Sequence, residues 1–179
     1  FWSPDGRRIA WSLTSSADAA RPPLRGTQMI EVDKPWSQQT PVTLPPVNAT
    51  GDWFNGYHWS PDGKRLVGTT AGLQGHEVRT NAGLWLYSFE TNRYEQITQF
   101  GSNPEWLADN RHLVFIHLGK GEIAEQRVWL VDTQTQTTKP LMTHPTQVIS
   151  TLGLTRDNRR LFFTATDHQS DVFLLSLDK

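Results

Sequence analysis

Residues able to do acid–base or metal chemistry form no recognisable motif in this chain. His76 and Glu77 begin like the zinc motif H-E-x-x-H, but Thr80 stands where the second histidine would be. No serine lies in G-x-S-x-G, and no segment reads G-x-x-x-x-G-K-[ST]. The 179 residues include no cysteine, which excludes thiolate zinc sites and cysteine nucleophiles. We therefore predict a chain that is not itself an enzyme and that holds no metal and no cofactor.

One set of carboxylates does recur at a fixed place in four similar segments. Four equivalent carboxylates could in principle surround a metal ion. Aspartate is favoured in tight turns for its geometry alone, however, and equivalent residues of successive repeats would lie far apart. We interpret these four as turn residues: Asp5, Asp62, Asp109 and Asp157. The six histidines are interpreted as scattered surface residues: His58, His76, His112, His117, His144 and His168.

The segments that hold the aspartates are copies of one phrase. FWSPDGRRIAW begins at Phe1 and HWSPDGKRLVG begins at His58, and weaker copies follow as EWLADNRHLVF and GLTRDNRRLFF. Trp2, Trp59, Trp106 and Leu154 occupy the same place in each copy, at spacings of 57, 47 and 48 residues. The longer first interval contains an Ala-, Pro- and Arg-rich stretch that we interpret as a loop insertion. Such self-similarity at a fixed period predicts a repeat architecture.

The repeated phrase has the chemistry of a tight β-hairpin. Proline before the aspartate presets the backbone for the second position of a turn. Gly6 and Gly63 then supply the positive φ that such a turn needs, and Asn110 and Asn158, which tolerate this conformation best after glycine, replace them in the weaker copies. Each copy is therefore expected to join two antiparallel strands.

Further apolar runs complete each repeat. A run of β-branched and aromatic residues follows every turn, a second comes later, and a third, weaker one appears in three copies, which predicts four strands per repeat. Several runs are apolar at consecutive positions, so both faces of the sheet should be covered. We therefore predict an all-β fold, a β-propeller of four-stranded antiparallel blades, because a sandwich would not need one hairpin four times and a β-helix has a much shorter period. The whole of 1–179 is expected to form one propeller domain, with blades at about 1–55, 56–102, 103–149 and 150–179.

The repeats SPDGRRIAW and SPDGKRLVG, with the closing TRDNRRLFFTATDHQSDVFLLSLDK, resemble the WD-like propeller repeats of the TolB family, and the closing segment resembles a C-terminal blade. The resemblance covers nearly the whole chain. It implies the propeller fold, but the same hairpin occurs in translocation-system proteins, in the non-catalytic propellers of prolyl-oligopeptidase-like enzymes and in the sensor halves of bacterial kinases.

About four blades are visible, and the last lacks its outer strand. We expect the chain to be part of a larger propeller of about six to eight blades, with an upstream segment or domain of the same polypeptide as a partner. The alternative is a self-contained ring of four blades. A structure with 172–177 paired beside the blade of Phe1 would favour that alternative.

Composition excludes two classes of partner. The net charge is −1, with 17 basic and 18 acidic residues, whereas a nucleic-acid binder usually carries a basic stripe. No run of 18 apolar residues is present, so no transmembrane segment is expected. The compartment stays open: the resemblance favours a periplasmic or extracytoplasmic place, and a cytoplasmic one is the alternative.

The connections on one side of the predicted propeller are long. They are the loops between the second and third strands and those between blades: 14–27, 70–82, 117–127, 45–56, 99–103 and 143–150. Because loops carry binding while the scaffold holds them, we predict a binding surface there. Its candidate residues are Arg21, Arg25, Asp52, Trp53, Phe54, His76, Arg79, Lys120, Glu122 and His144. Trp53 and Phe54 lie in NATGDWFNG, away from any strand pattern, and are the expected aromatic anchors, although Trp53 could equally cover the adjacent hairpin.

Three functions remain open at this point. The first is a non-catalytic module that binds a protein or peptide, as the scaffold or sensor portion of a larger bacterial protein. The second is the regulatory propeller of a prolyl-oligopeptidase-like serine peptidase whose catalytic domain is absent from this chain. The third is a propeller enzyme that acts on a sugar or lactone in a central channel.

Overall fold

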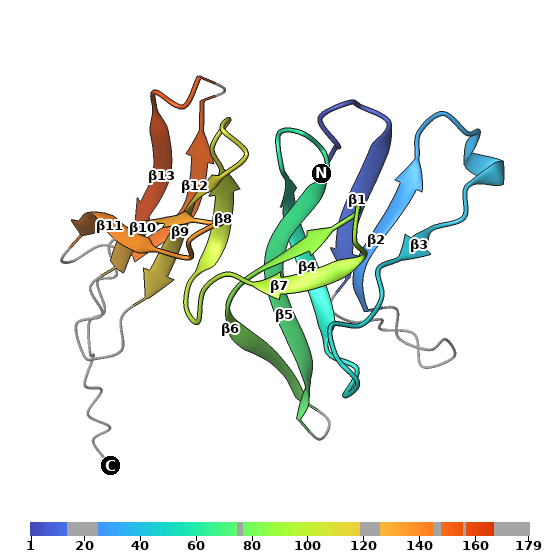
Figure 1. The fold of residues 1–179 in the computed structure, drawn as a ribbon, viewed down its shortest axis with the longest axis horizontal. Helices are drawn as coiled ribbons and strands as arrows, with labels where there is room; N and C mark the ends of the chain where they lie inside the picture. Colours follow the sequence, from blue (N-terminus) through green and yellow to red (C-terminus); the bar gives the residue numbers. More distant parts are fainter. Residues whose placement is uncertain (14–24, 75–76, 119–125, 145–147, 156, 167–179) are drawn as a thin grey trace, which may run out of the picture.

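The computed structural model describes residues 1–13, 25–74, 77–118, 126–144, 148–155 and 157–166, and every structural statement below concerns these residues. Their regular structure is β, apart from one short 3₁₀ helix, η1 (Trp36–Gln38). No helix among them is long and apolar enough to cross a membrane. The strands form four antiparallel sheets that follow one another in chain order (Figure 1).

The two central sheets have four strands each. The second sheet has the order β4-β5-β6-β7, with β4 (Trp53–Trp59), β5 (Arg65–Gln74), β6 (Glu77–Ser88) and β7 (Arg93–Gln96). The third has the order β8-β9-β10-β11, with β8 (Ser102–Trp106), β9 (His112–Leu118), β10 (Gln126–Asp132) and β11 (Thr138–His144). Each is the meander that the sequence predicts, with every strand beside its neighbour in the chain.

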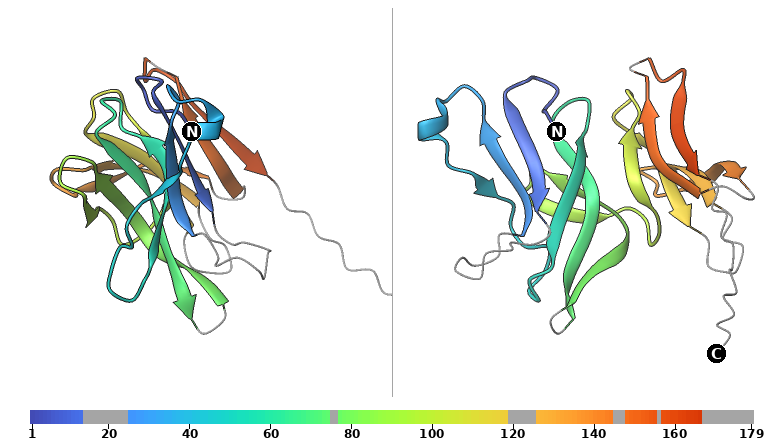
Figure 2. Two further views of the ribbon diagram at one scale, coloured as in Figure 1. Left: turned by 90° about the vertical axis from the view of Figure 1, so that its right-hand side faces the viewer. Right: turned by 180° about the vertical axis from the view of Figure 1, so that it is seen from behind.

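The two outer sheets are smaller. The first contains β1 (Arg8–Leu13), β2 (Gly26–Glu31) and β3 (Val42–Thr43), and its predicted first strand is represented by one bridge between Trp2 and Ile9. The fourth contains β12 (Val148–Leu154) and β13 (Leu161–Thr166), and the third strand predicted for it lies outside the described residues. The view from behind shows the same row, with the first and fourth sheets at opposite ends (Figure 2, right).

The repeated phrase folds as the predicted hairpin in all four copies. The left-handed position has φ of 70° at Gly6 and Gly63, 58° at Asn110 and 57° at Asn158. In the second copy the Ser60 hydroxyl donates to Asp62 and accepts the Arg65 backbone N–H at 2.9 Å, while Asp62 accepts the N–H of Lys64 at 3.0 Å. The first and fourth copies repeat this network. The aspartates of these copies therefore stabilise the hairpin turns by accepting backbone N–H groups.

Each hydrophobic core among the described residues lies between two adjacent sheets. Leu66 and Tyr87 of the second sheet meet Ala10 of the first, and Val67 and Leu84 of the second meet residues of the third. The second sheet thus buries both of its faces, which is why its strands are apolar at consecutive positions. A third cluster joins the third and fourth sheets through Val114, Ile116, Val128 and Ile149.

An arginine joins neighbouring sheets at two of these boundaries. The Arg8 guanidinium lies 4.4 Å from the centre of the Trp59 ring and donates to the Gly63 carbonyl at 3.1 Å. Arg65 likewise lies 4.9 Å from the centre of the Trp106 ring and donates to the Asn110 carbonyl. We name this pairing the arginine–tryptophan contact.

All six predicted loops are wrong in part, because strands extend into each of them. The loop 14–27 ends before β2 at Gly26, 99–103 ends before β8 at Ser102, 117–127 lies between the end of β9 at Leu118 and the start of β10 at Gln126, and 143–150 lies between the end of β11 at His144 and the start of β12 at Val148. Residues 70–82 were expected to be a loop, but β5 continues to Gln74 and β6 begins at Glu77, paired from Thr70–Asn81 to Gln74–Glu77. The stretch Thr-Thr-Ala-Gly shows no alternation of apolar and polar residues, so the sequence pattern did not indicate a strand there. The two strands are extended by backbone pairing between β5 and β6. The loop 45–56 ends at Asp52, because β4 already begins at Trp53.

Candidate binding surfaces

The predicted loop-side residues are only partly visible. Arg21, His76, Lys120 and Glu122 lie outside the described residues. Arg79 lies in β6 and His144 in β11, but their side chains lie outside the described part. The structure therefore places four of the candidates, Arg25, Asp52, Trp53 and Phe54.

Trp53 and Phe54 are not loop anchors. Both lie in β4, paired with Ala71 and Thr70 of β5, and their exposed fractions are 6% and 1%. Phe54 belongs to the core between the first and second sheets, where its ring lies 5.4 Å from that of Tyr94. The expectation of two exposed aromatic side chains is thus wrong, because two adjacent residues of a strand covered on both faces are both buried.

Arg25 is held against the buried indole of Trp53. Its guanidinium lies 4.9 Å from the ring centre, at the start of β2, and it is half-buried. This stacking fixes a cation on the loop side, so of the placed candidates Arg25 is the one available to a partner.

Asp52 closes the turn before β4. Its carboxylate accepts from the Asn48 amide at 2.9 Å, and its N–H donates to the Asn48 side-chain oxygen at 3.0 Å. The Val47 N–H also donates to the Asp52 carbonyl at 2.7 Å. The carboxylate lies close against Gly72 of β5, where a side chain would collide with it. Asp52 therefore shapes the loop.

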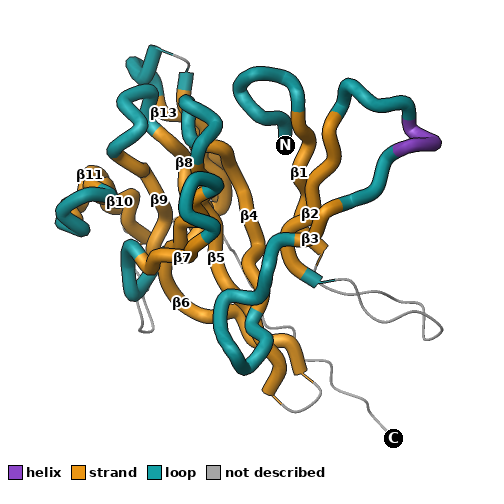
Figure 3. Tube along the Cα trace, turned by 45° about the vertical axis from the view of Figure 1, so that its right-hand side comes forward, coloured by secondary structure: helices purple, strands orange, loops and turns teal. Residues whose placement is uncertain are grey.

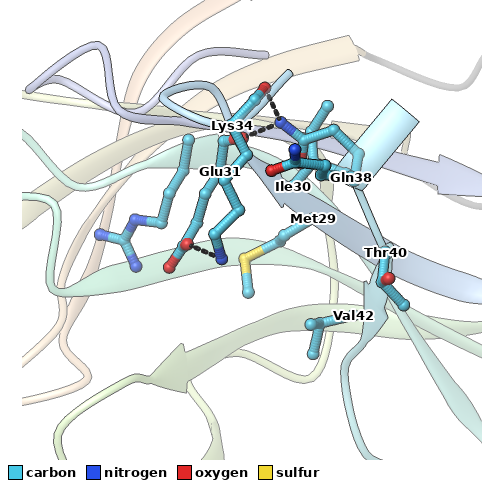
Figure 4. Close-up of a pocket in the computed structure, with 9 residues that line it drawn as sticks. Met29, Ile30, Glu31, Lys34, Gln38, Thr40 and Val42 are labelled. Atoms are coloured by element: carbon cyan, nitrogen blue, oxygen red, sulfur yellow. Dashed lines mark hydrogen bonds and ion pairs between the residues drawn. The ribbon is translucent and has the colours of Figure 1, made fainter. Parts of the chain in front are cut away.

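A groove that the sequence did not predict lies on the first sheet, toward the hairpin side. It has a volume of about 430 Å³ and runs between β2 and the connection to β3 (Figure 4). Met29 and Val42 supply apolar surface, and Val42 is 59% exposed. The rim is polar: Glu31 and Lys34 form an ion pair at 2.6 Å, and the Gln39 amide donates to the Lys34 carbonyl at 2.7 Å.

The rim carries both signs of charge. The Lys34 ammonium lowers the pKa of Glu31, and Glu31 raises the pKa of Lys34 in return, so both stay ionised at neutral pH. Their side chains are more than half exposed, so a partner can reach either charge.

A smaller groove occupies the equivalent place on the second sheet. It has a volume of about 250 Å³, and its lining includes Arg65, Leu86 and Glu95, which correspond in strand register to Arg8, Met29 and Val42. The difference in size follows from the last connection of each sheet: residues 32–41 and helix η1 in the first, against residues 89–92 in the second (Figure 3). In the sequence, the length of the connection 32–41 was the feature that could have indicated this groove.

A partly buried acid–base pair lies between the first strands of the two central sheets, with the His58 side chain 43% exposed and that of Glu105 20% exposed. His58 Nε2 is 3.2 Å from Glu105 Oε1. Burial raises the pKa of Glu105 to about 7 and lowers the pKa of His58. From the sequence we interpret His58 as a surface histidine, and its side chain is partly exposed, but the sequence gives no sign that Glu105 lies beside it. No group of three or more metal-ligating side chains occurs in the described part of the chain.

Comparison with known proteins identifies the fold. No family model and no curated protein sequence matches the chain. TolB from Acinetobacter baumannii matches 89% of this chain with a TM-score of 0.61 and 21% identity, and a protein from Agrobacterium tumefaciens assigned to TolB matches 93% with a TM-score of 0.65 and 15% identity. Puromycin hydrolase matches 78% with a TM-score of 0.57 and 16% identity. The matching domains are rings of antiparallel blades.

The fold is a β-propeller. The chain spans 36% and 53% of the lengths of the two TolB structures and 24% of puromycin hydrolase, so its four sheets are blades of a partial propeller. The structural matches establish the fold, and at identities this low the function has to be argued from the residues of this chain.

The propeller fold places the pair of His58 and Glu105 within the blades. The first strands contact each other from blade to blade, β4 with β8 and β8 with β12. These strands are therefore the inner edges of the blades, which face the central channel of a propeller. His58 and Glu105 lie on this inner side, whereas the groove of the first blade lies between outer strands.

Proposed function

We propose that this chain is a non-catalytic propeller module that binds a peptide or protein, as a TolB-like scaffold or sensor portion of a larger bacterial protein. The observation that carries the proposal is the groove of the first blade, with its Met29 and Val42 surface and its paired charges at Glu31 and Lys34. Ligand sites combine an apolar surface with a few placed polar groups in this way.

The shape of the groove fits part of a polypeptide. A volume of about 430 Å³ accommodates one or two side chains, and the groove is open to solvent. An apolar side chain can cover Val42, while Lys34 and Glu31 offer a charge of either sign to its neighbours in the peptide. Arg25, stacked on Trp53, supplies a second contact on the loop side of the propeller.

The two TolB matches support the scaffold form of this proposal as a likeness of fold. The likeness to puromycin hydrolase supports a second candidate function, that of the regulatory propeller of a prolyl-oligopeptidase-like peptidase. In that case the partner would be a catalytic domain of the same enzyme.

Selection from a random peptide library displayed on phage tests the proposal. Peptides selected on the purified chain should bind with a measurable Kd and should lose at least tenfold in affinity when Val42→Asp places a charge in the groove, a change of about 1.4 kcal/mol. Val32→Asp is the matched control, because Val32 is also an exposed valine, 37% against 59%, and does not line the groove.

Two outcomes would contradict the proposal. One is a library from which no peptide is enriched over a bare support. The other is a set of peptides whose affinity falls equally with Val32→Asp and Val42→Asp, which would place binding elsewhere.

A further inference from the structure

One cation of the first-blade groove has no carboxylate partner among the described residues. Arg8 lines the groove, and its guanidinium lies 4.4 Å from the centre of the Trp59 ring and 4.9 Å from that of Phe89. Its side chain makes one hydrogen bond within the described part of the chain, from Nη2 to the Gly63 carbonyl at 3.1 Å. Because a guanidinium has five N–H donors, most of the donors of Arg8 remain for a ligand.

The two carboxylates within reach of the Arg8 charge are engaged elsewhere. Glu31 lies opposite Arg8 in the register of β1 and β2, but it forms its ion pair with Lys34 at 2.6 Å. Lys34 is also the main cause of the lowered pKa of Glu31, and Arg8 contributes less. Asp5 accepts the Arg7 N–H at 3.1 Å within the hairpin turn. The groove therefore holds one neutralised pair of charges and one arginine whose charge is not paired.

This arginine and the apolar surface of the groove share one face of the first blade. Cross-strand partners, and residues two apart in a strand, point to the same face of a sheet. Arg8 pairs with Glu31, and Met29 pairs with Val42, so all four side chains lie on one face. Met29 packs against the core between the first and second blades. The groove thus lies on the side of the first blade that faces the second, with a cation beside its apolar surface.

We propose that the groove takes an acidic peptide, in which a side-chain carboxylate binds Arg8 and a neighbouring apolar side chain covers Met29 and Val42. This inference rests on the proposed peptide binding and names the class of peptide. Stacking and the backbone hydrogen bond already hold the guanidinium in place, so little side-chain entropy is lost when a carboxylate binds it. Arginine can bind a carboxylate through two parallel hydrogen bonds. A basic peptide would place a like charge against Arg8.

Sequencing the phage-displayed library before and after selection tests the charge preference. Peptides enriched on the wild-type chain should carry an aspartate or glutamate beside an apolar residue more often than the input library does. The most enriched peptide is then synthesised with a fluorescent label and an amidated C-terminus, so that its carboxylates come from side chains alone. In fluorescence polarisation the wild-type chain should bind it about tenfold more tightly than a counterpart with the carboxylate changed to an amide. Added salt should reduce this difference.

A double-mutant cycle tests whether the carboxylate binds Arg8. The acidic peptide and its amide counterpart should bind Arg8→Gln with equal affinity. Arg7→Gln is the matched control for charge, because Arg7 is exposed, adjoins Arg8 and does not line the groove. Arg65→Gln is the control for structure, because it removes the same arginine–tryptophan contact at the next boundary between blades. Both controls should keep the tenfold preference. If Arg8→Gln does not fold, Arg8→Lys replaces it, since lysine keeps the charge but lacks the planar fork and should lower the preference.

The outcomes separate this inference from the proposed function. Enriched peptides that lack a carboxylate, and whose affinity still falls with Val42→Asp, would overturn the acidic preference and leave peptide binding in the groove intact. A preference that the Arg8 variant leaves unchanged would also overturn it. So would a preference that Arg65→Gln removes to the same extent, because it would then depend on the joint between blades. A library from which no peptide is enriched would overturn both proposals.

Discussion

The residues that recur in the sequence serve the hairpins and the joints between blades. Ser60 and Asp62 satisfy three polar groups of one turn, and the same network in the first and fourth copies explains why these residue types recur there. The arginine after the turn has a different role, because its guanidinium packs against a tryptophan ring of the next blade. The sequence shows both as one phrase, and only the structure separates local from inter-blade roles.

Replacing Arg65 by alanine should therefore destabilise the joint between the second and third blades. The change removes a cation–π contact with Trp106, worth about 0.5–2 kcal/mol, and a hydrogen bond from a charged donor to the Asn110 carbonyl, worth about 1.5–3 kcal/mol. We expect a loss of about 2–4 kcal/mol in the free energy of unfolding, measured with urea. Arg93→Ala, an exposed arginine of β7, should change it by about 0.5 kcal/mol or less, and equal effects would contradict the assigned role.

Glu105 should make stability fall as pH rises. Its pKa is raised by burial to about 7 in the folded chain, from about 4.5 when exposed, so the folded state binds the proton more tightly. This contribution is complete below pH 4.5 and is lost by about pH 7. His58 has the opposite effect, because burial lowers its pKa and stability gained from it rises with pH. Urea unfolding from pH 4.5 to 8 should show that Glu105→Gln abolishes the fall, and a parallel pH profile for both proteins would refute it.

At the scale of elements, the periodic parts of the fold could be predicted and the aperiodic parts could not. The hairpin turns were readable because Gly6 and Asn110 mark a required left-handed conformation. The start of β4 at Trp53 was missed, because an aromatic pair after a polar loop looks the same whether it is exposed or buried. The groove depends on the path of the long connection 32–41, which no local pattern encodes, and the pair of His58 with Glu105 depends on two strands 47 residues apart.

The pairing of β4 with β5 requires glycine at one point. Gly68 lies opposite Gly56, and a side chain at residue 68 would collide with the Asn55 carbonyl. Gly68→Ala should therefore cost about 1–3 kcal/mol, measured as a lower urea midpoint with an unchanged slope. Gly153→Ala in β12 is the control, because a side chain there meets open space. If both substitutions leave the midpoint unchanged, the close approach of β4 to β5 is wrong.

At the scale of the molecule, the protein is a row of blades in which each core is shared by two neighbours. Repeat proteins of this kind are stabilised by nearest-neighbour interfaces, so damage to one interface should spread to the two blades that share it and fade beyond them. Leu113 tests this, because it is fully buried between the second and third blades with Val67 and Leu84, and Leu→Ala costs about 2–5 kcal/mol in such sites. Native-state hydrogen exchange should show faster exchange in β5 and β9 of Leu113→Ala, with β1 and β2 less affected. Leu44→Ala, in the core between the first and second blades, should reverse the order and spare β9. Uniform acceleration in all four sheets by either substitution would mean that the row unfolds as one unit, and the blades would then share a single cooperative core.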